Sequence, residues 1–133
     1  MYFRKEETWV NNQMWSWIYF TDEEVEGGSF DDLLRLWISY YDRRISFIFV
    51  FDTSDLHQIP PIYLCLQMAL FIRELKQRDF HYLVSSHILI SHHVLLKLIE
   101  VIFAIQKPVA PVYIYLTDQP WTSLLSPSSV ILP

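Results

Sequence analysis

The densest group of side chains capable of chemistry directly follows a strongly apolar run at residues 46–51. It comprises five polar loop residues and two prolines behind them: Asp52, Thr53, Ser54, Asp55, His57, Pro60 and Pro61. Open α/β sheets bind ligands outside the carboxyl ends of their strands, so these residues form the candidate partner-binding site. Asp, Thr and Ser after a strand also satisfy turn backbone and cap the next helix. Both interpretations remain open from the sequence.

Catalytic chemistry has little support in the residue pattern. Ser54, Asp55 and His57 form a local cluster without a nucleophile elbow, so a hydrolase that uses Ser54 and His57 is the weakest alternative. Gly27 and Gly28 are the only glycines, which leaves no glycine-rich loop for a phosphate. We therefore expect a protein that is not an enzyme and needs no cofactor.

The five histidines raise the question of a metal site. His92 and His93 lie near His87 in sequence, but adjacent residues on a helix point about 100° apart. No cysteine or carboxylate stands beside them at ligand spacing. The sequence thus predicts that no metal binds.

Composition disfavours several classes of partner and environment. The formal net charge is −5 and the ten Lys and Arg residues are scattered, which disfavours nucleic acid. Cys65 is the only cysteine and has apolar neighbours, which predicts a small core side chain in a reducing compartment. The first residues lack the apolar run of a signal peptide, and the longest apolar stretches are shorter than the roughly 20 residues of a membrane span. We expect a cytoplasmic protein without a transmembrane segment.

Periodicity places the candidate residues on alternating strands and helices. Residues 4–10 and 14–20 are predicted to pair as a hairpin across Asn11-Asn12. Ser29 can cap a helix on which apolar residues share one face: Phe30, Leu33, Leu34, Trp37, Ile38 and Tyr41. Residues 46–51 show no polar alternation, which predicts a strand covered on both faces.

The second half of the chain continues the alternation. We expect a helix over 62–78 after the prolines, a strand over 82–90, a helix over 93–106 and a strand over 112–116. Because parallel strands need crossovers, this order predicts an α/β fold with a single mixed, mostly parallel sheet and helices packed on it. Residues 1–116 would form this one domain, and residues 117–133 a Pro- and Ser-rich tail that is poorly ordered or laid across the surface.

The predicted third helix carries more apolar surface than one sheet face would cover. Lys97, Glu100 and Lys107 mark only a narrow polar stripe along it. The surplus would be buried under Trp121, Leu124 and Leu125 of the tail, or it would line a lipid pocket or a protein interface. The sequence weighs these outcomes about equally.

Three segments in order resemble a known family. They are Ile18-Tyr-Phe-Thr-Asp22, Phe47-Ile-Phe-Val-Phe-Asp-Thr-Ser54 and Ala104-Ile-Gln-Lys-Pro-Val109. Together they resemble the STAS domain, the anti-sigma-factor-antagonist fold, and more distantly the CRAL-TRIO lipid-transfer core. The resemblance covers about residues 18–116 and is one of pattern and order.

The STAS resemblance implies non-enzymatic binding of a protein, switched in that family by phosphorylation of a serine at the start of the second helix. The corresponding positions here are Pro60 and Pro61, which have no hydroxyl, so the switch does not carry over. The leading interpretation is a STAS-like domain that binds a protein partner or a second copy without this switch. The alternative is a CRAL-TRIO-like carrier of a lipid or a small apolar ligand.

Overall fold

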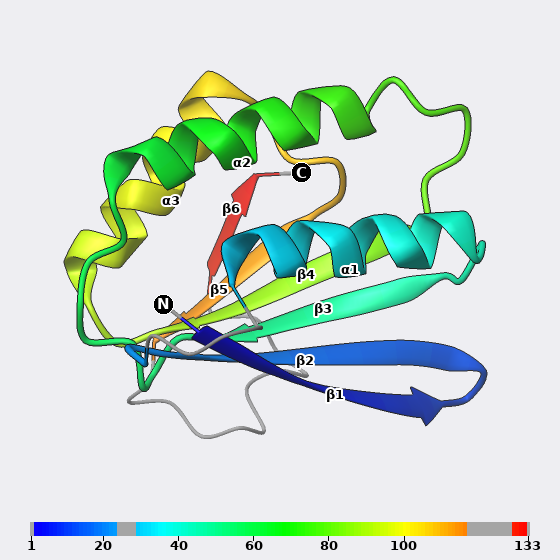
Figure 1. The fold of residues 1–133 in the computed structure, drawn as a ribbon, viewed down its shortest axis with the longest axis horizontal. Helices are drawn as coiled ribbons and strands as arrows, with labels where there is room; N and C mark the ends of the chain where they lie inside the picture. Colours follow the sequence, from blue (N-terminus) through cyan, green and yellow to red (C-terminus); the bar gives the residue numbers. More distant parts are fainter. Residues whose placement is uncertain (1, 24–28, 117–128, 133) are drawn as a thin grey trace.

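The predicted α/β fold with one mixed, mostly parallel sheet is confirmed in a computed structural model, which describes residues 2–23, 29–116 and 129–132 (Figure 1). Six strands lie in the order β1-β2-β3-β4-β5-β6. Neighbours from β2 to β5 pair in parallel, whereas β1 and β6 pair antiparallel at the two edges. The strands are β1 (Tyr2–Val10), β2 (Gln13–Thr21), β3 (Phe47–Asp52), β4 (Leu83–Ile90), β5 (Val112–Leu116) and β6 (Ser129–Leu132).

The three helices cover one face of this sheet, as Figure 1 shows. They are α1 (Phe30–Asp42), α2 (Ile62–Leu75) and α3 (His93–Ile105), and each connects two adjacent parallel strands. Crossovers between parallel strands are right-handed, so successive steps in one direction across the sheet put every helix on the same side. Side chains on the other face of the sheet therefore have no helix above them in the described part of the chain.

The first hairpin forms as the sequence predicts. Val10 pairs with Gln13, and Asn11 and Asn12 between them have φ angles of 51° and 65°. Two positive φ angles characterise the turn whose twist matches the flanking strands, and asparagine tolerates them better than most residues. This turn sets the register of the whole β1–β2 pair.

Helix α1 begins at the predicted cap. The Ser29 side chain accepts a hydrogen bond from the Asp32 backbone, and Asp32 in turn accepts one from the Ser29 backbone, which together form a capping box. Of the predicted apolar face, Leu33, Trp37 and Tyr41 are buried. Tyr40 is buried as well, although the periodicity did not place it there.

Strand β3 lies inside the sheet, with parallel partners on both sides. Phe47 and Phe49 are fully buried towards the helices. On the opposite face Val50 is also fully buried, among side chains that include Trp15, Trp17 and Tyr113. The prediction that this strand is covered on both faces is confirmed, with aromatic side chains rather than a second helix layer on the outer face.

The C-terminal segment contains a strand that the sequence did not predict. Residues 129–132, within the predicted tail, form β6 and pair with β5. Trp121, Leu124 and Leu125, the suggested cover for the third helix, lie outside the described residues. Within the described ranges, no helix is long and apolar enough to cross a membrane.

Candidate functional site

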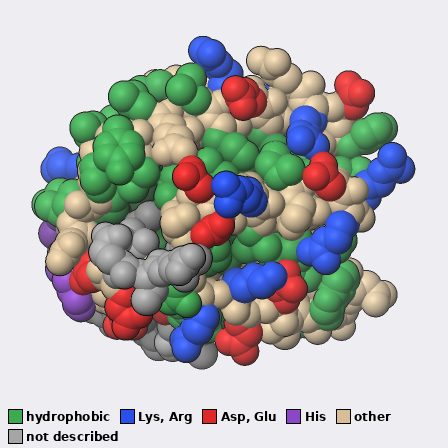
Figure 2. All heavy atoms as spheres, in the orientation of Figure 1, with side chains coloured by type: hydrophobic (Ala, Val, Ile, Leu, Met, Phe, Trp, Pro, Cys, Tyr) green, Lys and Arg blue, Asp and Glu red, His purple; other side chains and the backbone are tan. Residues whose placement is uncertain are grey.

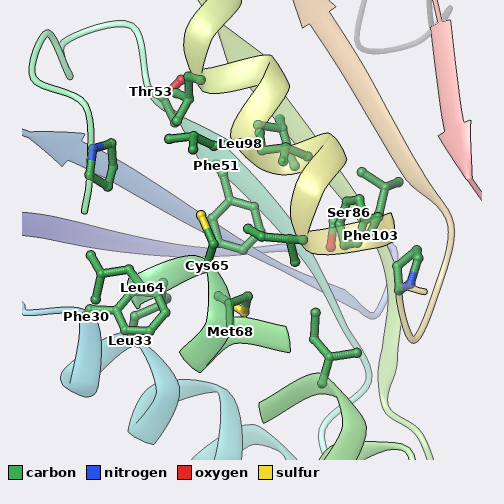
Figure 3. Close-up of a pocket in the computed structure, with 18 of the residues that line it drawn as sticks. Phe30, Leu33, Phe51, Thr53, Leu64, Cys65, Met68, Ser86, Leu98 and Phe103 are labelled. Carbon is green, nitrogen blue, oxygen red and sulfur yellow. The ribbon is translucent and has the colours of Figure 1, made fainter. Parts of the chain in front are cut away.

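A cavity of about 170 Å³ lies between the helix layer and the sheet (Figure 3). All three helices contribute to its wall, together with β2 to β5 and the loops before α2 and β5. Its lining includes Phe20, Leu33, Trp37, Phe51, Leu64, Cys65, Met68, Ile88, Leu98, Ile99 and Phe103. The cavity is partly open to solvent, because several wall residues, such as Leu64, Met68 and Phe103, are only half-buried.

The wall of the cavity is uncharged. Among the described residues that line it, none is Asp, Glu, Lys, Arg or His. The polar side chains in the wall include the hydroxyl groups of Thr53 and Ser86 and the thiol of Cys65. Burial raises the pKa of the Cys65 thiol, which keeps it neutral. The indole Nε1 of Trp37 is buried without a hydrogen-bond partner among the described residues. Such a wall favours an uncharged, apolar occupant.

Helices α2 and α3 leave this space because neither has one narrow apolar face. They pack on each other, yet Ile62, Leu66 and Leu70 of α2 and Val101 and Ile105 of α3 remain exposed. Ile99 is the single buried residue of α3. The surplus apolar surface expected for the third helix is thus present on both helices of the pair.

The predicted loop after β3 serves as a turn in the structure. Asp52 Oδ1 accepts hydrogen bonds from the Ser54 backbone at 2.9 Å and from Ser54 Oγ at 2.5 Å. Thr53 donates to the carbonyl oxygen of Leu89 on β4 from its backbone at 3.0 Å and from Oγ1 at 2.5 Å. Asp52 and Thr53 are buried and only Asp55 of the early loop is exposed. The polar density of this loop therefore has a structural explanation.

Asp22, at the end of β2, holds the second part of the loop. Its carboxylate accepts hydrogen bonds from the His57 backbone at 2.9 Å and the Gln58 backbone at 2.8 Å. These hydrogen bonds lower the pKa of the Asp22 carboxyl, and the bond from the Gln58 backbone has the largest effect. Sequence reasoning did not assign Asp22 to the site, because the two segments lie 35 residues apart. The signal that could have found it is an acidic residue at the carboxyl end of a neighbouring strand.

The loop that Asp22 holds also closes one side of the cavity. Leu56 is buried and Pro60 is half-buried, and both line the cavity. Pro61 is exposed and occupies the N-cap position of α2, without a side-chain cap. The candidate region from Asp52 to Pro61 thus contributes its apolar members to the cavity wall and presents Asp55, His57 and Pro61 to solvent.

Two histidines, His57 and His92, lie next to each other, and His87 lies elsewhere in the structure. The rings of His57 and His92 lie 5.9 Å apart between centroids, at the start of α3. His87 is buried on the outer face of the sheet, where its Nδ1 and the Tyr115 hydroxyl are 2.9 Å apart. Burial lowers the pKa of His87. Within the described ranges, no three His, Cys, Asp or Glu side chains are grouped to hold a metal ion.

The Ser54–His57 pair has no catalytic arrangement among the described contacts. Ser54 Oγ donates to Asp52, and the hydrogen bonds of His57 involve its backbone and Asp22. A nucleophilic serine requires a base within hydrogen-bond reach. The geometry gives no support to the hydrolase alternative.

In comparisons with known proteins, no family model, no curated protein and no solved structure matches this chain.

Proposed function

We propose that this protein binds a small, uncharged, apolar ligand in the cavity beneath α2 and α3. The observation that carries the proposal is an unfilled space of about 170 Å³ with an apolar, uncharged wall. This is the carrier alternative that the sequence left open, restricted to a smaller ligand. The STAS-like interpretation stays a prediction.

The hydrophobic effect supports an apolar ligand at this site. The wall is apolar, and several of its residues are only half-buried, so a ligand that covers them removes apolar surface from water. The volume of about 170 Å³ is close to that of cavities that bind molecules like benzene.

Size also restricts the class of ligand. Pockets for drug-sized molecules usually have volumes of about 300 to 1,000 Å³. The cavity of about 170 Å³ falls below this range, so it suits a single substituted ring or a short hydrocarbon chain. A whole phospholipid, the larger cargo of a lipid carrier, exceeds it.

Calorimetry with ethylbenzene tests the proposal. We expect saturable binding and a rise in the melting temperature, because a ligand that binds only the folded state stabilises it in proportion to the logarithm of its concentration. The variant Cys65→Leu adds volume at a residue in the cavity wall (Figure 3) and should reduce binding at least tenfold.

Leu66→Phe is the matched control, because it adds volume at the next residue of α2, which faces solvent. It should bind ethylbenzene like the wild type. The absence of saturable binding to the wild type, or equal affinities of Cys65→Leu and the wild type, would contradict a ligand-binding cavity.

A second candidate function, self-association, is favoured by the exposed apolar surface of α2 and α3. We call this surface the helix-pair patch; it comprises Ile62, Tyr63, Leu66, Leu70, Val94, Val101 and Ile105. Figure 2 shows apolar side chains gathered on the side of the molecule where these helices lie in Figure 1. Each helix carries one acidic and one basic residue, Arg73 and Glu74 on α2 and Lys97 and Glu100 on α3. A two-fold interface brings the same patch of both subunits together, so an apolar patch can bury itself.

Light scattering during gel filtration tests this second function. Leu66→Glu and Leu70→Glu should convert a dimer to a monomer, whereas Phe80→Glu, a change at an exposed apolar residue outside the two helices, should not. Pro61→Asp, next to Ile62 at the start of α2, should also weaken association while the circular dichroism spectrum stays unchanged. A wild-type monomer at millimolar concentration would contradict the proposal.

A further inference from the structure

Strand β1 forms one edge of the sheet, and within the described part of the chain it pairs with β2 alone (Figure 1). Every residue from Arg4 to Val10 is exposed, and Trp9 keeps 61% of its exposure. The outer backbone edge of this nine-residue strand can therefore accept another strand. An exposed edge of this kind is a template for strand addition, in which main-chain hydrogen bonds supply affinity.

The hairpin turn determines which backbone groups face that edge. Val10 and Gln13 close the two-residue turn, and in turns of this kind the closing residues form a hydrogen-bonded pair. Because hydrogen-bonded pairs alternate along antiparallel strands, every second residue of β1 points its NH and C=O groups away from β2. These residues are Phe3, Lys5, Glu7 and Trp9.

The side chains of these four residues lie on the face of the sheet that the helices cover. Phe3 belongs to the core cluster, and Glu7 accepts a hydrogen bond from the Tyr40 hydroxyl of α1. Along this face the order is aromatic, basic, acidic, aromatic, and Lys5 Nζ lies 3.9 Å from Glu7 Oε2. In the reverse direction the basic and acidic positions exchange. The strand is thus complementary in charge to an antiparallel copy of itself.

We propose that β1 pairs with β1 of a second copy of this chain, antiparallel and about a two-fold axis at Glu6, so that the two sheets become one. Glu6 is the middle residue of the strand, so all nine residues lie opposite a residue of the second copy. Lys5 then lies opposite Glu7 of the second copy, and Phe3 opposite Trp9. Cross-strand pairs of opposite charge, and pairs of aromatic rings, stabilise antiparallel strands.

Other registers lose these pairs. Side chains directly opposite each other point to the same face of a sheet, so a residue itself has to lie on the two-fold axis. With Lys5 on the axis, the two lysines oppose each other and Phe3 lies opposite Glu7. With Glu7 on the axis, two carboxylates oppose each other and Lys5 lies opposite Trp9. The register at Glu6 is therefore the one that joins opposite charges on the helix-covered face.

The outer face carries the one unfavourable pair of this register. The two Glu6 side chains oppose each other at the axis, while Arg4 of each copy lies diagonally to the Glu6 of the other, within reach of a long side chain. Arg4 is on this face, because its guanidinium lies 5.0 Å from the centre of the Tyr19 ring. The charges of the two Arg4 and two Glu6 side chains sum to zero, which limits the repulsion.

This interface is separate from the helix-pair patch and does not depend on the ligand proposed for the cavity. Strand β1 is at the edge of the sheet farthest from β5, and α3 runs between β4 and β5. One strand edge buries less than the roughly 1,600 Å² of a standard interface, so we expect pairing at millimolar rather than micromolar concentration. The two contacts can therefore be measured separately.

Sedimentation equilibrium of Leu66→Glu tests the edge by itself, because this change removes association through the helix-pair patch. We expect a monomer at micromolar and a dimer at millimolar concentration. Addition of Lys5→Pro should leave a monomer throughout, because proline removes an outward NH and is tolerated where the NH of an edge strand faces solvent. Lys5→Ala keeps this NH, is the matched control, and should still dimerise.

Charge exchange tests the register. In the Leu66→Glu background, Lys5→Glu brings like charges opposite each other at two places and should weaken the dimer about tenfold, as should Glu7→Lys. An equimolar mixture of these two proteins restores both oppositely charged pairs and should recover the dimer. Circular dichroism checks that each variant is folded.

Three outcomes would overturn the proposal. If Leu66→Glu stays a monomer at millimolar concentration, the charges of β1 keep the edge unpaired, as they do on many edge strands. Equal association of folded Lys5→Pro and Lys5→Ala would place the contact elsewhere on the molecule. A mixture of Lys5→Glu and Glu7→Lys that does not recover the dimer would show that these two positions do not face each other.

Discussion

Helix α1 and the pair α2–α3 pack on the same face of the same sheet, but they pack differently. Helix α1 has a complete capping box and buries four residues, three of them aromatic: Leu33, Trp37, Tyr40 and Tyr41. Helix α2 also buries four residues, but smaller ones, and α3 buries only Ile99. Helices α2 and α3 have no side-chain caps and expose apolar residues. They also supply most of the helical residues in the cavity wall, to which α1 adds Phe30, Leu33 and Trp37.

The difference follows from residue patterning. The polar and apolar residues of α1 fall on separate faces, so the apolar face can be buried while the polar face stays in water. The residues of α2 and α3 are largely apolar on all sides. The sequence of each helix therefore does not define which side faces the sheet, the neighbouring helix or solvent. We infer that the large aromatic side chains of α1 contribute more to stability than the smaller buried side chains of α2 and α3.

The largest expected difference lies along β3. Phe49 is fully buried and its ring lies 5.0 Å from that of Trp37 and 4.7 Å from that of Phe51. Phe49→Ala should lower the free energy of unfolding by about 3–5 kcal/mol. Phe51→Ala, at the cavity wall, should cost less because that ring has an unfilled space beside it. Urea unfolding measures both, and equal losses would remove the distinction between the two sides.

The next effect concerns the polar anchor of α1. The Tyr40 hydroxyl donates to Glu7 and lies 2.8 Å from Ser16 Oγ, which is fully buried. Burial and the bond to Glu7 raise the pKa of Tyr40. Tyr40→Phe leaves Ser16 without a partner and should destabilise the protein by about 1–3 kcal/mol. The double variant Tyr40→Phe with Ser16→Ala should recover part of this loss, and no recovery would mean that the two hydroxyls act independently.

A smaller, stabilising effect is expected at the start of α3. His92 is the N-cap residue, has extended backbone, and makes no side-chain cap. His92→Asp should supply a cap and a negative charge at the helix start, which stabilises by about 0.5–1 kcal/mol. His92→Ala is the control that removes the imidazole without adding a cap. Thermal unfolding compares them, and equal melting temperatures would show that α3 does not limit stability.

The smallest effect is a pH dependence at the loop that closes the cavity. The pKa of Asp22 is lowered in the folded state by the backbone NH groups of Gln58 and His57, so its contribution is present above its ordinary value of 3.8 and is lost as pH falls below it. Between pH 5 and pH 3, the wild type should lose more stability than Asp22→Asn. Parallel pH profiles of the two proteins would show that these bonds do not form in solution.

The sequence by itself determined the local features of this fold. The Asn11-Asn12 turn, the Ser29 cap, the apolar strand from Phe47 to Phe51 and the proline entry to α2 were each predicted and are each present. These features depend on backbone preferences and on periodicity within a few residues. They can be predicted without knowing which distant residues each segment contacts. The surplus apolar surface of the third helix was equally visible, because it is a property of one helix.

Only the tertiary structure decided what that surplus surface does. The strand order puts all three helices on one face, and their packing leaves the cavity into which Ser86 points. It also brings Asp22 to a loop 35 residues away and makes a strand of residues 129–132. No local preference encodes these contacts, because each depends on how distant segments meet. A cavity in particular is a space that side chains from several elements together fail to fill, and it becomes visible only when those elements are assembled.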